Sequence, residues 1–249
     1  FGGGIAGTID ISDVLYFQFT GGVAFDSGTV ITVDDPGSLA RMDLWHNISA
    51  PDLSNLTLNI NGQGDALNLQ QDGVTFGSLN GNAQLLDNHD ASSSVTINSL
   101  NPGIGASSAG IGNFTADVDD TINVTLGSGT HSFDVGAVGG VVSNDLLDVS
   151  GNVSGTITLG GTLSVSLIGS ELAAGKTFDL FDASSISGSF SSTSLPDISS
   201  YGLSWDTSQL GVDGTLSTVV ATDTMHFGNG SENPITVTGT RNWDTTSSF

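Results

Sequence analysis

The sequence predicts an all-β fold, a parallel β-solenoid followed by a small antiparallel β module. Helical periodicity is almost absent from the 249 residues, and short segments alternate apolar and polar residues instead. Asn-Gly, Asp-Gly and Gly-Gly turn signals separate these segments at a spacing of roughly ten residues. Short strands at that spacing indicate a solenoid, a barrel or a sandwich, and a β-sandwich is the alternative to the solenoid.

We expect the solenoid in residues 1–143. Segments 56–60, 95–97 and 122–126 each place apolar side chains on one face and Thr or Asn on the other. Outward Thr, Ser and Asn side chains form polar ladders when strands stack in parallel, as they do in stacked parallel sheets generally. This composition of the outer face favours a solenoid for the first part of the chain.

The second part of the chain reads as a different module. Alternating segments at 157–159, 163–167 and 215–219 are expected to belong to an antiparallel module over residues 144–220. Residues 221–249 form a tail that begins with a polar stretch rich in Gly and Asn. The tail then contains a strand-like Ile235-Thr-Val237 and, near the end of the chain, Trp243.

Two regions resemble a known family. Residues 76–86, 94–97 and 112–115 resemble autotransporter-associated β-strand repeats, and residues 121–130 fit the end of such a unit. Residues 144–219 resemble the module that often closes such proteins, with Asp-Leu-Leu-Asp-Val-Ser-Gly, Leu-Gly-Gly-Thr-Leu-Ser-Val and Gly-Lys-Thr-Phe-Asp-Leu-Phe as its motifs.

The resemblance covers a little over half of the chain. These repeats occur in long exported passenger proteins of Gram-negative, planctomycete and verrucomicrobial type, so the resemblance implies export, an extracellular or cell-surface location and a β-solenoid. It implies no defined active site. The chain starts at Phe1 without Met and is short for a passenger, so we expect either that further parts were removed or that the chain assembles with others.

The charge balance excludes several classes of partner. Twenty-six acidic residues face only three basic ones, which gives a formal net charge of −23. Nucleic acid binding requires several Lys or Arg on one face, and this chain cannot provide them. We also expect no membrane span, since no apolar run is long enough. Packed copies of so acidic a chain require salt or divalent cations.

Calcium is the one cofactor that the sequence suggests, although no motif requires it. Carboxylates on turns suit Ca²⁺, and Asp117, Asp119 and Asp120 are the best candidate ligands, although no EF-hand spacing is present. Solvated turn residues are the alternative interpretation of these aspartates.

We expect no enzyme activity. The four His residues lie far apart in sequence, no Gly-x-Ser-x-Gly elbow occurs, and no pair of carboxylates is marked as a hydrolase pair. Trp45, Trp205 and Trp243 are expected to cap a core rather than to form a platform for sugars.

The function expected from these observations is a structural one. The chain is predicted to be a subunit of an extracellular fibre, surface layer or matrix that self-assembles into a homopolymer. Assembly is expected through β-strand edges or through a terminal strand that contains Ile235, Val237 and Trp243, with folding of that strand back onto its own module as the alternative. The runner-up is a surface adhesin or carbohydrate-binding passenger fragment, with cell-surface glycans as partners.

Overall fold

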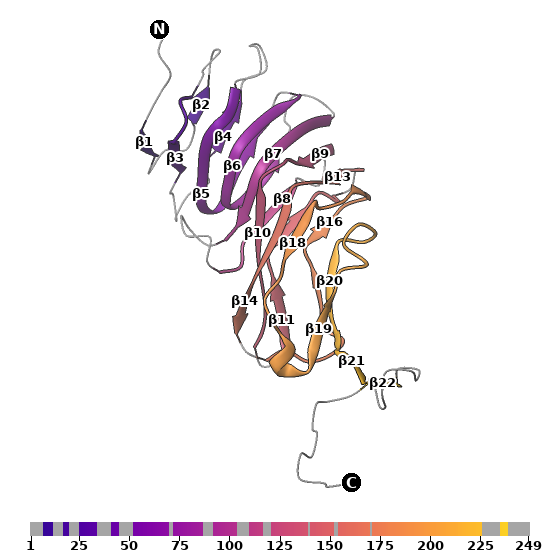
Figure 1. Ribbon diagram of the computed structural model, residues 1–249. Helices are drawn as coiled ribbons and strands as arrows, with labels where there is room; N and C mark the ends of the chain where they lie inside the picture. The colour runs from indigo at the N-terminus through magenta and orange to yellow at the C-terminus, as the bar shows by residue number, and fades with distance from the viewer. Residues whose placement is uncertain are drawn as a thin grey trace.

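The computed structural model describes most of the chain as β strands joined by short turns (Figure 1). The described residues are 7–11, 17–19, 25–33, 41–44, 52–69, 72–86, 92–103, 110–116, 121–138, 140–151, 154–169, 171–225 and 235–238. The largest sheet has 13 strands, and the strand pairs within it are parallel. The prediction of an all-β fold with a parallel, solenoid-like core is therefore confirmed, and the β-sandwich alternative is not adopted.

Successive turns of the chain stack as rungs, and each rung contributes a strand to each of two faces of the large sheet. The first face contains, in spatial order, β1 (Thr8–Ile11), β3 (Thr29–Val33), β5 (Asp52–Asn68), β6 (Val74–Leu86), β7 (Ser92–Pro102), β9 (Thr121–Leu126), β13 (Thr156–Leu159) and β17 (Ser185–Gly188). The second face contains β2 (Phe17–Phe19), β4 (Arg41–Leu44), the ends of β5 and β6, then β8 (Asn113–Ala116), β12 (Leu146–Asp148) and β16 (Phe181–Asp182).

Three smaller sheets complete the described structure. The first consists of β11 (Val141–Asn144), β10 (Thr130–Val138), β14 (Thr162–Gly169) and β18 (Ser192–Ser194); the second of β15 (Thr177–Asp179), β20 (Thr215–Val220) and β19 (Leu203–Asp206); the third of β21 (Thr222–Met225) and β22 (Ile235–Thr238). One 3₁₀ turn, η1 (Ser199–Tyr201), precedes β19. No helix in the part of the chain that the structure describes has the length and apolar character needed to cross a membrane.

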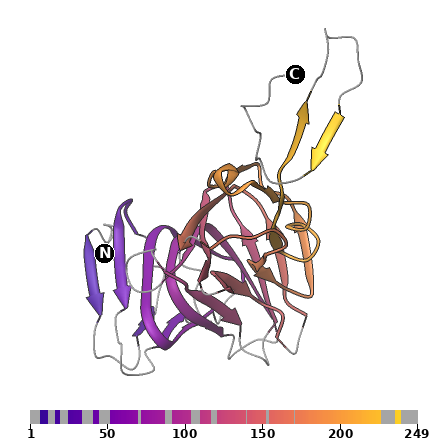
Figure 2. The same cartoon turned by 90° about the horizontal axis from the view of Figure 1, so that it is seen from below.

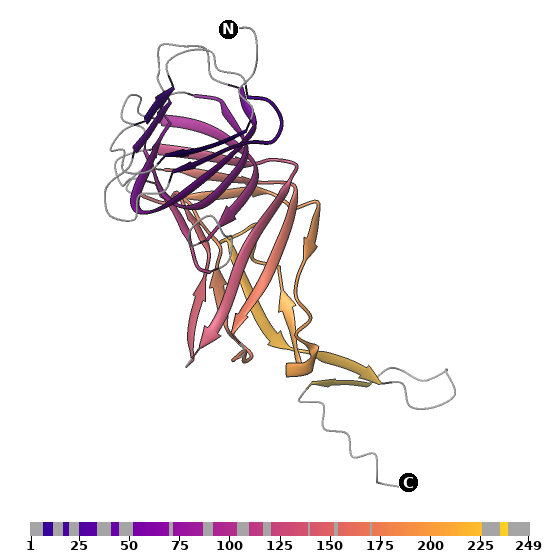
Figure 3. The same cartoon turned by 90° about the vertical axis from the view of Figure 1, so that its left-hand side faces the viewer.

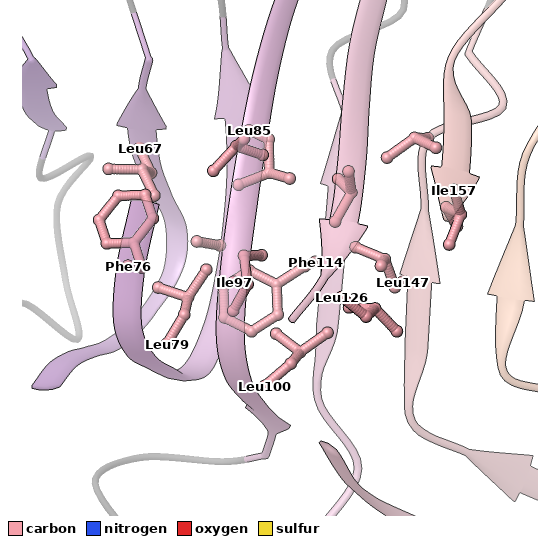
Figure 4. Close-up of a cluster of buried hydrophobic side chains, with 14 of the residues drawn as sticks. Leu67, Phe76, Leu79, Leu85, Ile97, Leu100, Phe114, Leu126, Leu147 and Ile157 are labelled. Carbon is pink, nitrogen blue, oxygen red and sulfur yellow. The ribbon is translucent and has the colours of Figure 1, made fainter. Parts of the chain in front are cut away.

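Columns of apolar side chains fill the inside of the stack. Alternation in each strand turns every second side chain inward, and the parallel register then places equivalent residues of neighbouring rungs on top of one another. Phe76 pairs with Ile97 and Ile97 with Leu126, while Leu79 pairs with Leu100; all five are at most 2% exposed. Figure 4 shows these side chains pointing into the space between the two faces.

An asparagine ladder, buried at Asn59 and half-buried at Asn80 and Asn101, links the same rungs. The Nδ2 of Asn101 donates to Oδ1 of Asn80 at 2.8 Å, Asn80 donates in turn to Asn59 at 2.8 Å, and Asn59 donates to the hydroxyl of Thr32 at 3.2 Å. The two Asn–Asn steps each span 21 residues and the last step spans 27. Each rung therefore satisfies the side-chain amide of its neighbour, as expected for polar ladders on a parallel stack.

Close approach between rungs requires glycine at one position of this ladder region. Gly81 pairs with Ile60 on the preceding rung and has a φ of +105°. A Cβ at position 81 would collide with the carbonyl oxygen of Ile60. Only glycine therefore combines this backbone conformation with the packing of the two rungs.

The parallel stack does not stop at residue 143, where the sequence predicted a change of module. β12 pairs in parallel with β8, β13 with β9, and β14 with β10, so three ladders join the two predicted domains. Antiparallel pairing in this region is restricted to β10 with β11 and to the sheet of β15, β20 and β19. An alternating pattern fixes which side chains are buried, but it leaves the direction of the partner strand open.

The C-terminal part closes the stack. The sheet of β15, β20 and β19 lies in the lower part of the body in Figure 1, where β15 contacts β11, and its residue Phe178 packs on Trp205 at 5.9 Å between ring centroids. β21 and β22 leave this body as a separate two-stranded sheet (Figure 2).

Candidate functional site

The predicted assembly strand lies in β22. Ile235 pairs with Met225 and Val237 with Asp223, in an antiparallel register with β21 of the same chain. Figure 3 shows the two strands extending away from the rest of the molecule. On the other side of β22, no strand among the described residues pairs with it. Trp243, the third residue of the predicted assembly strand, lies outside the described residues.

The predicted calcium ligands Asp117, Asp119 and Asp120 also lie outside the described residues, between β8 and β9. Among the residues that the structure describes, no group of three or more His, Cys, Asp or Glu side chains is arranged to hold a metal ion. Calcium at this position therefore stays a prediction.

A pair of buried carboxylates joins β10 to the segments on either side of it. Asp145 is 1% exposed, and its Oδ1 accepts a hydrogen bond from the backbone N–H of Gly112 at 2.8 Å while its Oδ2 accepts one from Asp134 at 2.7 Å. Asp134 is 8% exposed and accepts a hydrogen bond from the N–H of Gly110 at 3.0 Å. The pair therefore binds the start of β8 and the link from β11 to β12 onto β10.

Burial raises the pKa of the Asp145 carboxyl to about 7, against the opposing effect of the two N–H donors, and the neighbouring charge of Asp134 adds to the rise. A raised pKa of this size is common in catalytic acids. However, a carboxyl that is 1% exposed, with both oxygens engaged by the backbone, cannot contact a substrate. The chemistry of this pair is therefore structural, because it satisfies three backbone N–H groups at a bend of the chain.

His131 is the second buried ionisable side chain of this region. It is fully buried at the start of β10, where its Nε2 lies 3.2 Å from the carbonyl oxygen of Gly127 and its Nδ1 has no hydrogen-bond partner. Burial lowers the pKa of the imidazole. The ring centroid of Phe190 lies 6.3 Å away. The neutral imidazole therefore behaves here as part of the core.

A looser acidic group lies nearby on the second face. Asp148 and Asp182 are paired in register on adjacent rungs. Burial raises the pKa of Asp179, and the charges of Asp182, Asp213 and Asp148 add to the rise. Asp148 and Asp213 cap turns, since each accepts hydrogen bonds from the residue two positions later. Among the described residues, these carboxylates do not form a group that could hold a metal ion.

Trp205 caps a core, as the sequence predicts. Its Nε1 donates a hydrogen bond to the carbonyl oxygen of Pro196 at 2.8 Å while its ring packs on Phe178. Trp45 lies outside the described residues. The burial of Asp134 and His131 was not predicted, because nothing in the local pattern distinguishes these residues from exposed polar residues of other strands.

Comparisons of the chain with protein-family models, with curated proteins and with solved structures found no match. Structural information about the function therefore comes from the fold and from the chemistry of the described residues.

Proposed function

We propose that this protein is an exported structural subunit of an extracellular fibre, surface layer or matrix, and that it self-associates through strand edges or through its terminal strand. It does so without a catalytic centre. The resemblance to autotransporter-associated repeats supports export and display at a cell surface.

The observation that carries this proposal is a parallel stack that ends in strands with one neighbour each. Among the described residues, β1 pairs only with β3, and β17 only with β13. The free side of such a strand presents backbone N–H and C=O groups that can extend the sheet with a strand from another molecule. Since each rung contacts mainly its neighbours, an added strand continues the same geometry.

The sheet of β21 and β22 supports the same proposal. An isolated two-stranded hairpin is marginally stable in water, so a third strand from another copy would stabilise it. The net charge of −23 opposes contact between copies unless cations screen it. Assembly is therefore expected to depend on salt or on divalent cations.

Negative-stain electron microscopy of the full chain, with and without millimolar Ca²⁺, tests the proposal. Regular filaments or sheets support a self-assembling subunit. Monodisperse particles in both conditions contradict the proposal and favour the alternative, an adhesin or glycan-binding protein.

Two proline variants test whether β22 is the assembly strand. Successive N–H groups of a strand point to opposite sides, so of Thr236 and Val237 one donates toward β21 and the other toward the free side of β22. Proline removes the N–H and is tolerated on the free side only. We expect Thr236→Pro and Val237→Pro to have different effects, one of them preventing polymer formation while the hairpin stays intact by NMR. Unchanged polymers in both variants would exclude β22 and leave the edges of β1 and β17 as the candidate sites of assembly.

A further inference from the structure

A small cavity lies at the C-terminal end of the solenoid, between the last rung and the turn that follows β19. It has a volume of about 200 Å³ and is open to solvent on one side. One wall comes from β17 and from the start of β18, and the opposite wall comes from residues 207–211. The first wall belongs to the end of the parallel stack, whereas residues 207–211 follow β19 of the antiparallel sheet, so the cavity lies where the two meet.

The floor of the cavity is apolar. Leu159 and Leu210 are 4% and 5% exposed, and both line it. Phe190 forms an aromatic wall, half-buried, with its ring held against Phe181 at 5.8 Å between centroids. One face of a bound ligand would therefore be desolvated on an apolar surface. This surface includes the aromatic ring of Phe190, whose position is fixed by the core behind it.

The rim of the cavity carries three hydroxyl groups. Ser189, Thr193 and Thr207 line it, all three are exposed, and their hydroxyls have no hydrogen-bond partner among the described residues. A hydroxyl group can both donate and accept, so these three groups suit a ligand that itself carries several hydroxyls. They offer nothing specific to an ammonium or a carboxylate.

None of the described residues that line the cavity carries a charge. Asp206 and Asp213 flank the turn in sequence, but both carboxylates are engaged as turn caps. Asp206 accepts the N–H of Ser208 at 2.9 Å, and Asp213 accepts the N–H and the hydroxyl of Thr215 at 3.1 and 2.7 Å. The site is therefore neutral inside an acidic molecule, which disfavours anionic ligands.

We propose that this cavity binds one uncharged sugar residue, with a carbon-rich face of the ring on Phe190 and its hydroxyl groups toward Ser189, Thr193 and Thr207. The volume is below the range of about 300–1,000 Å³ typical of drug-sized ligands and therefore favours a single ring or the end residue of a glycan. The combination of an aromatic wall, an apolar floor and free hydroxyls complements the two kinds of surface that a neutral sugar presents. This inference does not depend on self-assembly through β1 or β22, and either proposal can fail without the other; only assembly through the edge of β17, whose Gly188 lines the cavity, would compete with the ligand.

Saturation-transfer difference NMR on the full chain tests the inference. The probes are the methyl α- and β-glycosides of glucose, galactose, mannose and N-acetylglucosamine, each at millimolar concentration. At least one glycoside is expected to receive saturation at its ring protons from the wild-type protein. Absence of transfer to all of them overturns the proposal.

Gly211→Leu provides the most direct control variant. Gly211 lines the cavity, does not have a left-handed φ, and a Cβ there would meet only the carbonyl oxygen of Gly188 at 3.7 Å, an ordinary contact. A side chain at this position therefore enters the cavity without disturbing the backbone. Loss of the NMR signal, with an unchanged melting temperature, is expected; a signal that persists places the sugar elsewhere and overturns the assignment.

A hydroxyl variant tests the polar contacts separately. Thr193→Val with Thr207→Val keeps the shape of the cavity and removes two hydroxyls, and binding is expected to weaken by about tenfold or more. Thr222→Val, an exposed threonine on β21 away from the cavity, is the matched control and should leave binding unchanged. Equal binding by all three proteins would show that the hydroxyls do not recognise the ligand and would overturn the proposal.

Discussion

The rungs from β5 to β9 pair in parallel throughout, whereas the region from β10 to β20 combines parallel and antiparallel pairs, and the two regions also differ in what they bury. In the first region, the described buried side chains are apolar or uncharged, and a ladder of buried and half-buried Asn side chains links the rungs. In the second region, Asp134, Asp145 and His131 are buried together with an aromatic cluster, in which Phe133 and Phe181 meet edge to face at 4.9 Å.

This difference shows which backbone groups need new hydrogen-bond partners where a repeating stack ends. A rung in the middle of a solenoid satisfies its backbone groups with the rungs above and below, so its interior can be wholly apolar. Where the chain turns from parallel rungs into an antiparallel sheet, some backbone N–H groups lose those partners. Asp145 and Asp134 supply acceptors for three of them. The second region is therefore expected to respond to pH near neutrality, whereas Asp72 in the first region, whose pKa is lowered by hydrogen bonds from Ser94, responds only in the acid range.

The largest expected effect comes from removing an aromatic ring where the second region meets the stack. Phe181 is fully buried on β16 and contacts both Phe133 and Phe190. Phe181→Ala should lower the free energy of unfolding by about 3–5 kcal/mol in chemical denaturation, because it leaves a cavity that the rigid stack cannot close. Val219→Ala, at a residue that is 39% exposed, should change it by less than about 0.5 kcal/mol. Equal losses in both variants would mean that the aromatic cluster is not part of the cooperative core.

The next largest effect is a pH dependence of stability through Asp145, in the second region. The pKa of Asp145 is raised to about 7 from 3.8, so between these values the folded protein binds a proton that the unfolded chain does not. The stabilisation associated with that proton is complete below the lower value and is lost as the pH rises through 7. Between about pH 5 and pH 8, the free energy of unfolding should fall by about 2–3 kcal/mol through this group.

Asp145→Asn isolates this contribution. The variant cannot ionise at this position. The free energy of unfolding of the wild type, measured relative to that of the variant, should therefore fall by about 2–3 kcal/mol from pH 5 to pH 8, while contributions from other groups cancel. A difference that is constant over the whole range would show that Asp145 is ionised in the folded protein at acidic pH as well. Denaturation at several pH values provides the measurement.

A smaller effect is expected in the first region. Asn80→Ala removes the hydrogen bonds to Asn59 and from Asn101 and leaves their partner atoms partly buried. The cost should be about 1–2 kcal/mol, independent of pH. Hydrogen exchange should show faster opening of residues 57–60, 78–81 and 99–102, whereas Thr75→Ala, on the same strand but outside the ladder, should leave these amides protected. A pH-dependent loss in Asn80→Ala would break the contrast between the two regions.

The smallest effect is expected at His131. Replacing it with Phe removes a buried, unpartnered Nδ1 and keeps a ring in contact with Phe190, so stability at neutral pH should change by less than about 1 kcal/mol. Because burial lowers the pKa of His131, the wild type loses stability as the pH falls through the range in which the unfolded imidazole takes up a proton. His131→Phe should remove that part of the loss. A large loss at neutral pH would instead show that the contact of Nε2 with Gly127 is essential.

Much of the fold could be predicted from the sequence because side-chain alternation is a local property. The pattern identified segments 56–60, 95–97 and 122–126 as strands with one apolar face, and these segments lie in β5, β7 and β9. The expected polar ladders are present as the chain from Asn101 to Thr32. The continuation of the stack beyond residue 143 could not be predicted, since the same alternation suits a parallel or an antiparallel neighbour.

The candidate sites depended on contacts that no local pattern contains. Asp145 and Asp148 lie in one motif, yet Asp145 is 1% exposed and Asp148 caps its own turn. Gly112 and Asp134, which decide this difference, are distant in the sequence. The cavity beside β17 is likewise formed by the end of the parallel stack and by a turn after β19, which only the tertiary fold brings together. The strand that contains Ile235 and Val237 was predicted from its pattern, and its intramolecular partner β21 was not.

The parallel register also determines how the molecule carries mechanical load. The backbone hydrogen bonds between rungs run along the axis of the stack, as the asparagine ladder does, whereas the covalent chain runs mainly across it. A force along the axis acts on the successive interfaces between rungs in series. The weakest interface therefore opens first, and the rungs unfold one after another. A pull along the strands loads the bonds of several rungs in parallel and meets a much higher resistance. A solenoid of this kind is stiff as a spacer and, when overloaded, extends stepwise instead of breaking.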